Sequence, residues 1–343
     1  MIEVESGLSE RQQGLLATIV REYDELKTPV GSDAIVRKYL PGVSPATVRN
    51  DMASLSAAGY ICSPHPSSGR IPTQQGYRHY VRNLMRPLEI SADERRMIDH
   101  QFHQIESDLD QWMRLAATVL AQTTGNASFV TTPLSRRSRL RHVDLIATRN
   151  HSALVVALLQ EGTLHQQLLV RSEAVEQDQL DRTARRLSHE LRGSVAADVR
   201  DWTNAESSLD EAVRDSLLEL MRRVDQQTRR EVWYDGVSSL LAEPEFSRID
   251  RAQEILRTFE QRRVLVEIAE AIKDRDGVQV LIGDENPSPV FRNCSVVSSR
   301  YGGDSAAGVI GVVGPTRMRY ERVIAILQYL GGLMTGLWAE LGE

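Results

Sequence analysis

The chain has almost no cysteine. Cys62 and Cys294 are the only two among 343 residues, and they stand far apart, without the close spacing of metal ligands. This scarcity excludes a disulfide framework and a cysteine-based zinc site, and it fits a protein of a reducing compartment. We therefore expect a cytoplasmic protein.

A secretory signal and a long apolar run are also lacking. The start, MIEVESGLSERQ, is acidic where a signal peptide needs a basic region followed by an apolar stretch. Residues 323–339 carry no formal charge, but this stretch includes three glycines and is shorter than the roughly 20 mostly apolar residues of a membrane-spanning helix. We expect no membrane partner.

Catalytic signatures are missing as well. We find no Ser-His-Asp, HExxH or paired-carboxylate pattern in a convincing context. His100 and His103 lie one helical turn apart, but no third metal ligand accompanies them. The segment GVIGVVGPT at 308–316 lacks the spacing of a phosphate loop or a dinucleotide fingerprint, and it predicts a buried strand and a turn. We predict no enzyme, no metal site and no cofactor.

The charge is unevenly distributed. The net charge of −6 by itself discourages binding to nucleic acid. Residues 27–86, however, carry eight basic and two acidic residues, a local charge of +6. A basic face on an acidic chain can bind phosphates, while the remainder limits adhesion to other polyanions. Charge alone leaves a merely solvated helix surface equally open.

The length predicts two or three domains, and the first has the outline of a winged helix. Helical periodicity, N-capping serines and Pro-Gly breaks predict three short helices, and a hairpin follows them. The expected helices are 8–25, 33–39 and 44–59, the expected strands are 60–62 and 70–71, and a domain boundary is expected near 86–92.

Beyond this domain, helix and strand signals come in blocks. Strands followed by helices and then strands again predict an α+β sheet domain that is interrupted by a mostly helical insertion. Helices are expected at 91–123, 174–232, 250–273 and from about 318, and strands at 128–130, 142–147, 153–159, 164–170, 278–282, 295–299 and 308–313.

The third helix of the first domain is the candidate recognition helix. Its outward face includes Ala46, Thr47, Arg49 and Asn50, and Ser44 caps its start. In a major groove, arginine can bond to guanine, asparagine to adenine and threonine to a base edge or a phosphate. Ser44 and the first amides of the helix can hold a backbone phosphate. The alternative is a winged helix that binds protein, but the pattern favours DNA.

The hairpin tip, PHPSSGR at 64–70, is suited to sugar-phosphate contacts or to the minor groove, although a plain turn is the alternative. Arg78, on the next helical segment, is expected to contact phosphate on all sequences alike. The predicted contacts of the hairpin are His65, Ser67, Ser68, Gly69 and Arg70.

These motifs resemble the family of the heat-inducible transcription repressor HrcA. The similarity brackets nearly the whole chain, because motifs at both ends occur in the same order. The matching segments are LSERQ (8–12), PVGSDAI (29–35), VSPATVRNDMASL (43–55), PHPSSGRIPT (64–73), GYRHYV (76–81), IGDENP (282–287), CSVVSSRYG (294–302) and GVIGVVGPTRMRYERVI (308–324).

The resemblance implies a multidomain α+β protein with a winged helix-turn-helix, a GAF-like α/β domain and an inserted, mainly helical dimerisation domain. It also implies a homodimer that binds double-stranded DNA at an inverted repeat called CIRCE, represses chaperone operons and is kept competent by the GroE chaperonin. The boundaries we expect are 1–87 for the winged helix, 88–126 for a linker helix, 127–170 and 251–343 for the GAF-like domain, and 171–250 for the insert.

Two other functions remain open at this stage. The GAF-like domain could bind a small effector, although no cysteine for a tetrapyrrole and no clear nucleotide motif accompanies it. A winged helix fused to an enzyme, as in bifunctional biotin ligases, is disfavoured because a basic glycine-rich adenylate loop is absent. For the dimer interface, the helical segment within 174–245 is our candidate.

Overall fold

The computed structural model divides the chain into two compact units. The first comprises Met1–Pro133, Glu231–Gly303 and Gly308–Glu343, and the second comprises Leu134–Arg230 and Asp304–Ala307. We call the second unit the insert; the first contains the winged helix, up to residue 84, and the central domain, from residue 92. The structure describes residues 7–39, 42–65, 68–105, 108–135, 138–149, 151–160, 162–174, 176–227, 231–272, 275–303 and 306–342.

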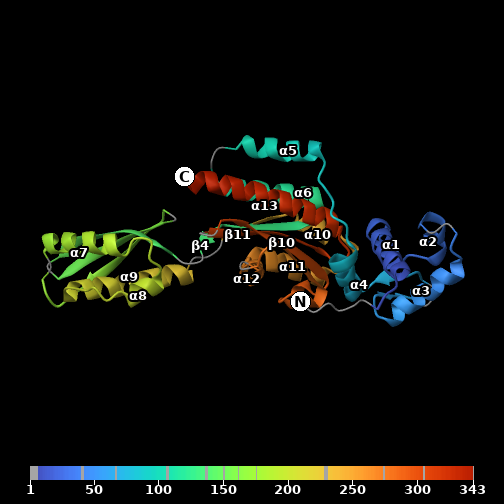
Figure 1. The fold of residues 1–343 in the computed structure, drawn as a ribbon, viewed down its shortest axis with the longest axis horizontal. Coiled ribbons are helices and arrows are strands. Elements are labelled where there is room, and N and C mark those ends of the chain that lie inside the picture. Colours follow the sequence, from blue (N-terminus) through green and yellow to red (C-terminus); the bar gives the residue numbers. More distant parts are fainter. Residues whose placement is uncertain are drawn as a thin grey trace. The chain divides into compact units, whose positions relative to one another are not determined.

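The winged helix has the elements that the sequence predicts. Ser9 and Ser44 cap the first and third helices through their side chains, and Pro45 occupies the first turn of the third. The two short strands pair antiparallel, and a bridge between Val30 and Arg70 adds a third short segment. The elements are α1 (Glu10–Leu26), α2 (Ser32–Tyr39), α3 (Pro45–Ala57), β1 (Ile61–Cys62) and β2 (Ile71–Pro72) (Figure 1).

The core of the winged helix follows from helical periodicity. Leu15, Leu16 and Ile19 of α1 are buried in one cluster with Val48 and Leu55 of α3. Burial of one such side chain contributes about 1.5–3 kcal/mol. The apolar faces therefore hold α1 and α3 together and leave the opposite face of α3 to solvent.

The helical segments that follow differ from the single helix expected over 91–123. Two helices occupy this range, because Asp108 is extended and caps the second of them with its side chain. The first of the two is capped by Ser91. The segments are α4 (Gln74–His79), the π-helical turn η1 (Tyr80–Leu84), α5 (Ala92–His103) and α6 (Leu109–Thr124).

The central domain is a sheet covered by helices on both faces. The strand order is β8-β3-β11-β10-β9, and the described registers of β3 with β8, β3 with β11 and β9 with β10 are antiparallel. Helices α6 and α13 cover one face, and α11 and α12 cover the other (Figure 1). The bounds are β3 (Ala127–Thr131), β8 (Val232–Asp235), β9 (Val278–Ile282), β10 (Cys294–Gly302), β11 (Ala306–Pro315), α10 (Val237–Leu241), α11 (Ile249–Gln261), α12 (Arg263–Ile272) and α13 (Tyr320–Gly342).

The glycine-rich segment at 308–316 is a buried strand and not a ligand loop. A Cβ at Gly308 would lie 2.4 Å from the ring of Tyr301, and one at Gly311 would lie 2.5 Å from the ring of Phe129. Phe129 is the strand partner of Gly311 in the β3–β11 register. The glycines are therefore needed where aromatic rings lie flat on β11.

Helix α13 is long and apolar enough to cross a membrane, by length and composition alone, and it is the one such helix in the part of the chain that the structure describes. In the structure it packs along β10 and α6. Tyr320, Val323, Ile326 and Leu330 are buried in the same cluster as the sheet. Its apolar composition is thus used in the core of the central domain.

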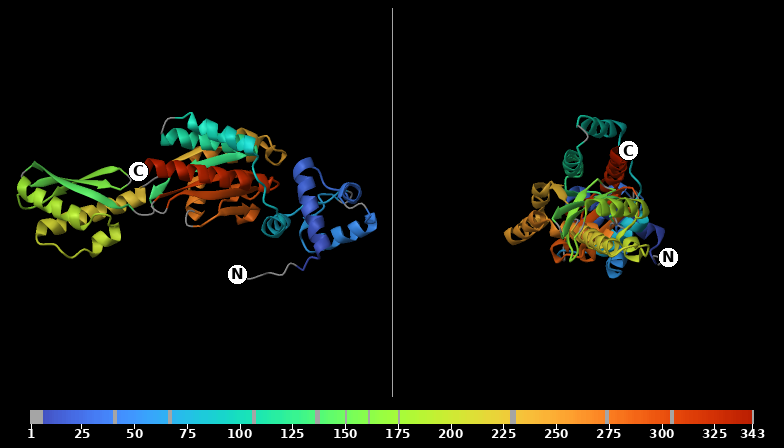
Figure 2. Two further views of the ribbon diagram at one scale, coloured as in Figure 1. Left: turned by 45° about the horizontal axis from the view of Figure 1, so that its top comes forward. Right: turned by 90° about the vertical axis from the view of Figure 1, so that its left-hand side faces the viewer.

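The insert is a three-stranded antiparallel sheet with helices on one face (Figure 2). Buried and less buried residues alternate along the middle strand, and the buried ones face the helices. The elements are β5 (Leu140–Arg149), β6 (Ser152–Leu159), β7 (Leu164–Val170), α7 (Gln177–Glu190), α8 (Ala196–Asp201) and α9 (Ser208–Gln227); the short β4 (Leu134–Ser135) pairs with the start of β11.

The insert thus begins and ends earlier than the 171–250 expected from the sequence, and its helices are accompanied by a three-stranded sheet. The strands between 140 and 170 pair with one another and share a core with α7 and α9, so they do not join the central sheet. Residues 232–235, which follow the helical pattern expected over 174–232, form β8 on the edge of the central sheet. The chain therefore returns to the central domain at residue 231.

A partly buried carboxyl group lies where the winged helix meets the central domain. The Tyr77 hydroxyl donates to Asp24 Oδ1 at 2.6 Å, and the rings of Tyr77 and Tyr320 lie 5.8 Å apart. Burial raises the pKa of Asp24 to about 8, and Glu321 adds to the rise, whereas the hydrogen bond from Tyr77 opposes it. Asp24 is therefore protonated in the folded chain at neutral pH.

This shift predicts how stability depends on pH. The carboxyl group of unfolded Asp24 ionises near its ordinary pKa of 3.8, whereas the folded one keeps its proton up to about 8, so the folded state binds more protons between these values. Stability therefore falls as the pH rises through this window. Asp24→Asn keeps an oxygen that can accept from Tyr77, and we expect it to lose less stability than the wild type between pH of about 5 and about 8 in urea unfolding. Equal losses in both proteins would contradict the assignment, and Asp93→Asn, at an exposed carboxylate of α5, is the control.

Candidate nucleic-acid interface

Helix α3 begins at a defined residue. The Ser44 Oγ accepts from the Thr47 amide at 3.1 Å, and Pro45 has the first helical position. The Ser44 and Thr47 hydroxyls are 2.9 Å apart and also share a hydrogen bond. This cap fixes which residues form the first two turns of α3.

The first two turns of α3 present the residues that the sequence singled out. Ala46, Arg49 and Asn50 are exposed and stand at i, i+3 and i+4, so they share one face; Ser44 is exposed at the cap and Thr47 is half-buried beside it. The apolar residues of α3 lie on the other side, in the core. The structure therefore brings these five predicted contacts together on an open surface.

The Arg49 guanidinium has weak partners on α2. Its Nε donates to Ser32 Oγ at 3.2 Å, and its Nη2 lies 3.3 Å from Asp33 Oδ1. The Arg49 and Asp33 side chains are 63% and 65% exposed, and an ion pair this exposed is worth about 1 kcal/mol or less. A base or a phosphate can replace it at small cost.

Asp51 of α3 has a structural role that the sequence analysis did not identify. Asp51 is buried and accepts two hydrogen bonds from Arg11 of α1, at 2.6 and 3.0 Å. A bidentate, charge-assisted pair of this kind fixes orientation as well as distance. It anchors α3 on α1 directly behind Arg49 and Asn50. Arg11 and Asp51 lie 40 residues apart in the sequence, so no local pattern indicates that they pair.

The tip of the hairpin is closed by its own side chains. The Ser68 Oγ donates to the His65 carbonyl at 2.7 Å and accepts from the His65 amide at 3.0 Å, and His65 is exposed. A Cβ at Gly69 would lie 2.5 Å from the backbone of Val30, so this position needs glycine for the close approach. Ser67 lies outside the described residues.

Arg70 is held at the base of the hairpin. Its backbone exchanges two hydrogen bonds of 2.9 Å with Val30, and its guanidinium donates to Ser63 Oγ. The side chain is half-buried. His65, Ser68, Gly69 and Arg70 thus lie in one hairpin, and His65 is the most open of them.

Arg78 lies away from the other predicted contacts. Its Nε donates to Glu285 Oε1 at 2.7 Å, its Nη2 donates to the Val280 carbonyl at 2.8 Å, and only 19% of its side chain is exposed. These partners belong to the central domain, so the guanidinium is already engaged within the protein. This position does not suit the phosphate contact expected from the sequence, and we leave Arg78 out of the interface.

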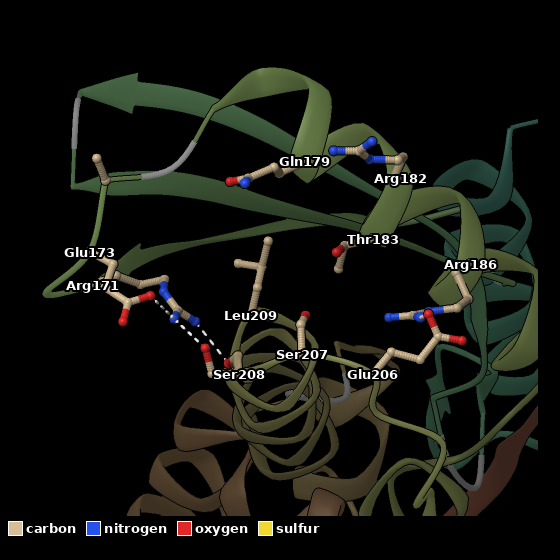
Figure 3. A pocket seen from close by; sticks show the side chains of 11 residues that line it. Arg171, Glu173, Gln179, Arg182, Thr183, Arg186, Glu206, Ser207, Ser208 and Leu209 are labelled. Atoms are coloured by element: carbon tan, nitrogen blue, oxygen red, sulfur yellow. Dashed lines mark hydrogen bonds and ion pairs between the residues drawn. The ribbon is translucent and has the colours of Figure 1, made fainter.

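Two cavities among the described residues have mainly polar linings. In the insert, a cavity of about 500 Å³ is lined by arginines (Figure 3). Arg186 there pairs with Glu206 and the buried Asp210, and Arg171 donates to the Ser208 carbonyl and hydroxyl at 2.8 and 2.9 Å. These bonds tie β7 and α7 to the start of α9, which is a structural role.

The described residues contain no group of three or more His, Cys, Asp or Glu that could hold a metal. The central domain has a cavity of about 670 Å³ beside β8, lined by Trp233 and Tyr234, where the Arg262 guanidinium lies 5.7 Å from the centre of the Tyr234 ring. No feature of this cavity singles out a ligand, so the small-effector function stays a prediction.

Family models match both parts of the chain. Residues 7–88 match the model described as "Winged helix-turn-helix transcription repressor, HrcA DNA-binding", and residues 110–324 match "HrcA protein C terminal domain". Among solved structures, a hypothetical protein has a TM-score of 0.58 at 23% identity, with 97% of this chain and 98% of that chain covered, which is a likeness of fold alone.

Curated relatives agree with the family models over nearly the full length. The chain is 40% identical to the "Heat-inducible transcription repressor HrcA" of Roseiflexus castenholzii, with 98% of this chain and 96% of the relative covered. It is 39% identical to the protein of the same description from Herpetosiphon aurantiacus, with 97% and 96% covered, and 36% identical to that of Thermomicrobium roseum, also with 97% and 96% covered. With its DNA-binding winged helix, the chain belongs to the HrcA family of heat-inducible transcription repressors, which are regulators and not enzymes.

Proposed function

We propose that this protein acts in the cytoplasm as a homodimer that binds the inverted-repeat CIRCE operator and represses chaperonin and chaperone operons. The observation that carries the proposal is the open face of α3. Ala46, Arg49 and Asn50 stand in its first two turns, where a helix laid in the major groove meets base edges.

Each predicted contact has a role in this proposal. Arg49 bonds to guanine and Asn50 to adenine, while Thr47 and the capped start of α3, with Ser44, hold a phosphate. Ala46 packs against a base edge. In the hairpin, the contacts proposed for sugar and phosphate are His65, Ser67, Ser68 and Arg70, with Gly69 shaping the backbone.

The dimer, we propose, forms through the open face of the insert sheet and not through its helices. In the register, Ile146 pairs with Leu154 and Leu154 with Leu168, and directly opposed residues share a face. Leu158 and Leu164 form a second apolar pair on that face. Three strands therefore present apolar side chains on this face, beside the polar His142, Asp144 and Gln166.

The exposure of this surface is high for a sheet of a folded protein. Ile146, Leu164, Leu168 and Val170 are 48%, 62%, 56% and 70% exposed, whereas the opposite face packs against α7 and α9. A group of exposed apolar side chains of this kind is typical of an association site. A second copy is the occupant that a two-fold operator requires.

The central domain is GAF-like in this proposal, and in each copy it carries one of the two winged helices of the dimer. Support comes from its antiparallel sheet between two layers of helices and from the family resemblance. The resemblance also underlies the last part of the proposal, in which the GroE chaperonin keeps the repressor competent until heat diverts it to unfolded clients.

The base-reading role of Arg49 is tested by its removal. We expect Arg49→Ala to lose about 1 to 3 kcal/mol of operator affinity and to relax the preference at one base pair, because a bidentate contact to guanine is lost. Fluorescence anisotropy on a set of single-base operator variants measures both effects. Arg96→Ala, at an exposed pair on α5, is the matched control. If Arg49→Ala weakens operator and random DNA equally, Arg49 does not read a base.

The dimer interface is tested by placing a charge on the open sheet face. We expect Leu168→Glu to convert the dimer to a monomer, because a buried and unpaired carboxylate costs several kcal/mol. Arg185→Glu, on the exposed side of α7, is expected to leave the dimer intact. Sedimentation equilibrium measures both. A dimer that survives Leu168→Glu but dissociates with Arg185→Glu would place the interface on the helices.

The chaperonin's role is tested on the promoter of the genome's own chaperonin genes. At a fixed, subsaturating concentration of the repressor, we expect added GroE chaperonin to increase protection of the inverted repeat in a footprinting experiment. An unfolded client protein, added in excess, is expected to reverse the increase by competition for the chaperonin. A footprint that responds to neither addition would remove the chaperonin from the proposal.

A further inference from the structure

The covalent connection between the winged helix and the central domain does not fix their angle. Residues 85–91, between η1 and α5, form neither helix nor strand, and residues 86–89 are exposed. Such a segment lets a small domain rotate unless other contacts hold it. The angle of the winged helix must therefore come from noncovalent contacts with the central domain. Some of these contacts are the Tyr77–Tyr320 ring contact, the Tyr80–Glu321 hydrogen bond and the Lys27–Glu243 ion pair.

Helix α4 adds other contacts at a turn of the central domain, Gly283–Glu285, which follows β9. Glu285 is itself fixed in this turn, since its Oε2 accepts from the Ile282 amide at 2.8 Å. Its other oxygen accepts from Arg78 Nε at 2.7 Å. The Arg78 Nη2 pairs with Glu285 Oε2 and also donates to the Val280 carbonyl at 2.8 Å, so the guanidinium is held by two separate groups of the central domain.

A second contact lies one helical turn away on α4. The Gln74 Oε1 accepts from the Asp284 amide at 3.1 Å, and its Nε2 donates to the Arg292 carbonyl at 3.4 Å. Gly283 leaves room for this amide, because a Cβ there would lie 2.1 Å from Gln74 Cδ. Two contacts four residues apart on one helix fix its direction as well as its position.

We propose that the Arg78–Glu285 ion pair, supported by Gln74 on the Gly283–Glu285 turn, adds to the apolar contacts the directional bonds that fix the angle of the winged helix, and thereby sets the half-site spacing that the dimer accepts. This inference rests on the proposed dimeric operator binding. Arg78 is a positioning residue: it touches no DNA, and it acts by holding α3 at a set distance from the α3 of a second copy.

Fixed geometry matters because the second half-site is bound within the same complex. The effective concentration of the second winged helix is highest when its position matches the span between half-sites. If the winged helix rotates freely, this concentration falls at the natural spacing and rises at others. Loss of the ion pair therefore flattens the dependence of affinity on spacing, while each winged helix still reads its own half-site.

The experiment compares Arg78→Ala, Glu285→Gln and the double variant in the full-length chain. Glu285→Gln removes the charge and keeps an oxygen for the Ile282 amide. The DNA duplexes carry the inverted repeat at its natural spacing, the same repeat with one or two base pairs added or removed, a single half-site, and random sequence. Arg96→Ala is the matched arginine control, and melting temperatures establish that each variant is folded.

We expect each single variant to bind the natural operator about tenfold more weakly and to lose most of the preference for its spacing, with half-site and random DNA unchanged. The double variant loses no more than the single ones, because both act through one pair. Three results would overturn the inference. The first is a spacing preference that stays as in the wild type, and the second is a melting temperature that falls without any change in DNA binding. The third is an equal loss of affinity for all DNA with Arg78→Ala alone, because a lost phosphate contact has this effect. If the wild type itself does not prefer an inverted repeat to a half-site, the proposed function fails, and there is no spacing for Arg78 to set.

Discussion

Helix α3 can bury only one of its sides, and this packing constraint governs the whole interface. Val48, Met52 and Leu55 occupy the core beside α1, and the buried Asp51 is bound by Arg11 at the edge of that contact. The capped start of the helix then determines which side chains face outward in the first two turns. The polar face is therefore presented by the fold itself, before any DNA is bound.

Sequence preference, dimerisation and the angle of the winged helix depend on different physical interactions. Base contacts from α3 supply sequence preference, apolar burial on the insert sheet supplies association, and the polar junction around α4 supplies geometry. The residues that make these three kinds of contact lie in separate parts of the chain, so each kind can be changed by substitution without the others. A repressor assembled in this way can lose operator affinity through altered geometry alone, with its recognition helices intact and folded.

Local patterns were sufficient for the winged helix and insufficient for what surrounds it. Serine caps, Pro45 and helical periodicity predicted α1 to α3 and the hairpin, because these signals act within a few residues. The environment of Arg78 could not be predicted, since its partner Glu285 lies 207 residues further along the chain. Strand signals likewise predicted β5 to β7, but they did not show which sheet these strands join. Because we assigned the strands to the central sheet, the insert was expected to start at 171, whereas it starts before residue 140. β8 was missed because it is only four residues long and directly follows a long helical pattern.

The central claim is that α3 reads base edges in the major groove of two related half-sites. Methylation interference on the chaperonin promoter tests it most directly, because a methyl group on guanine N7 occupies the major groove. The account predicts that methylation of a guanine in each half of the inverted repeat blocks binding, at positions related by two-fold symmetry. Binding that is indifferent to these methyl groups would contradict it.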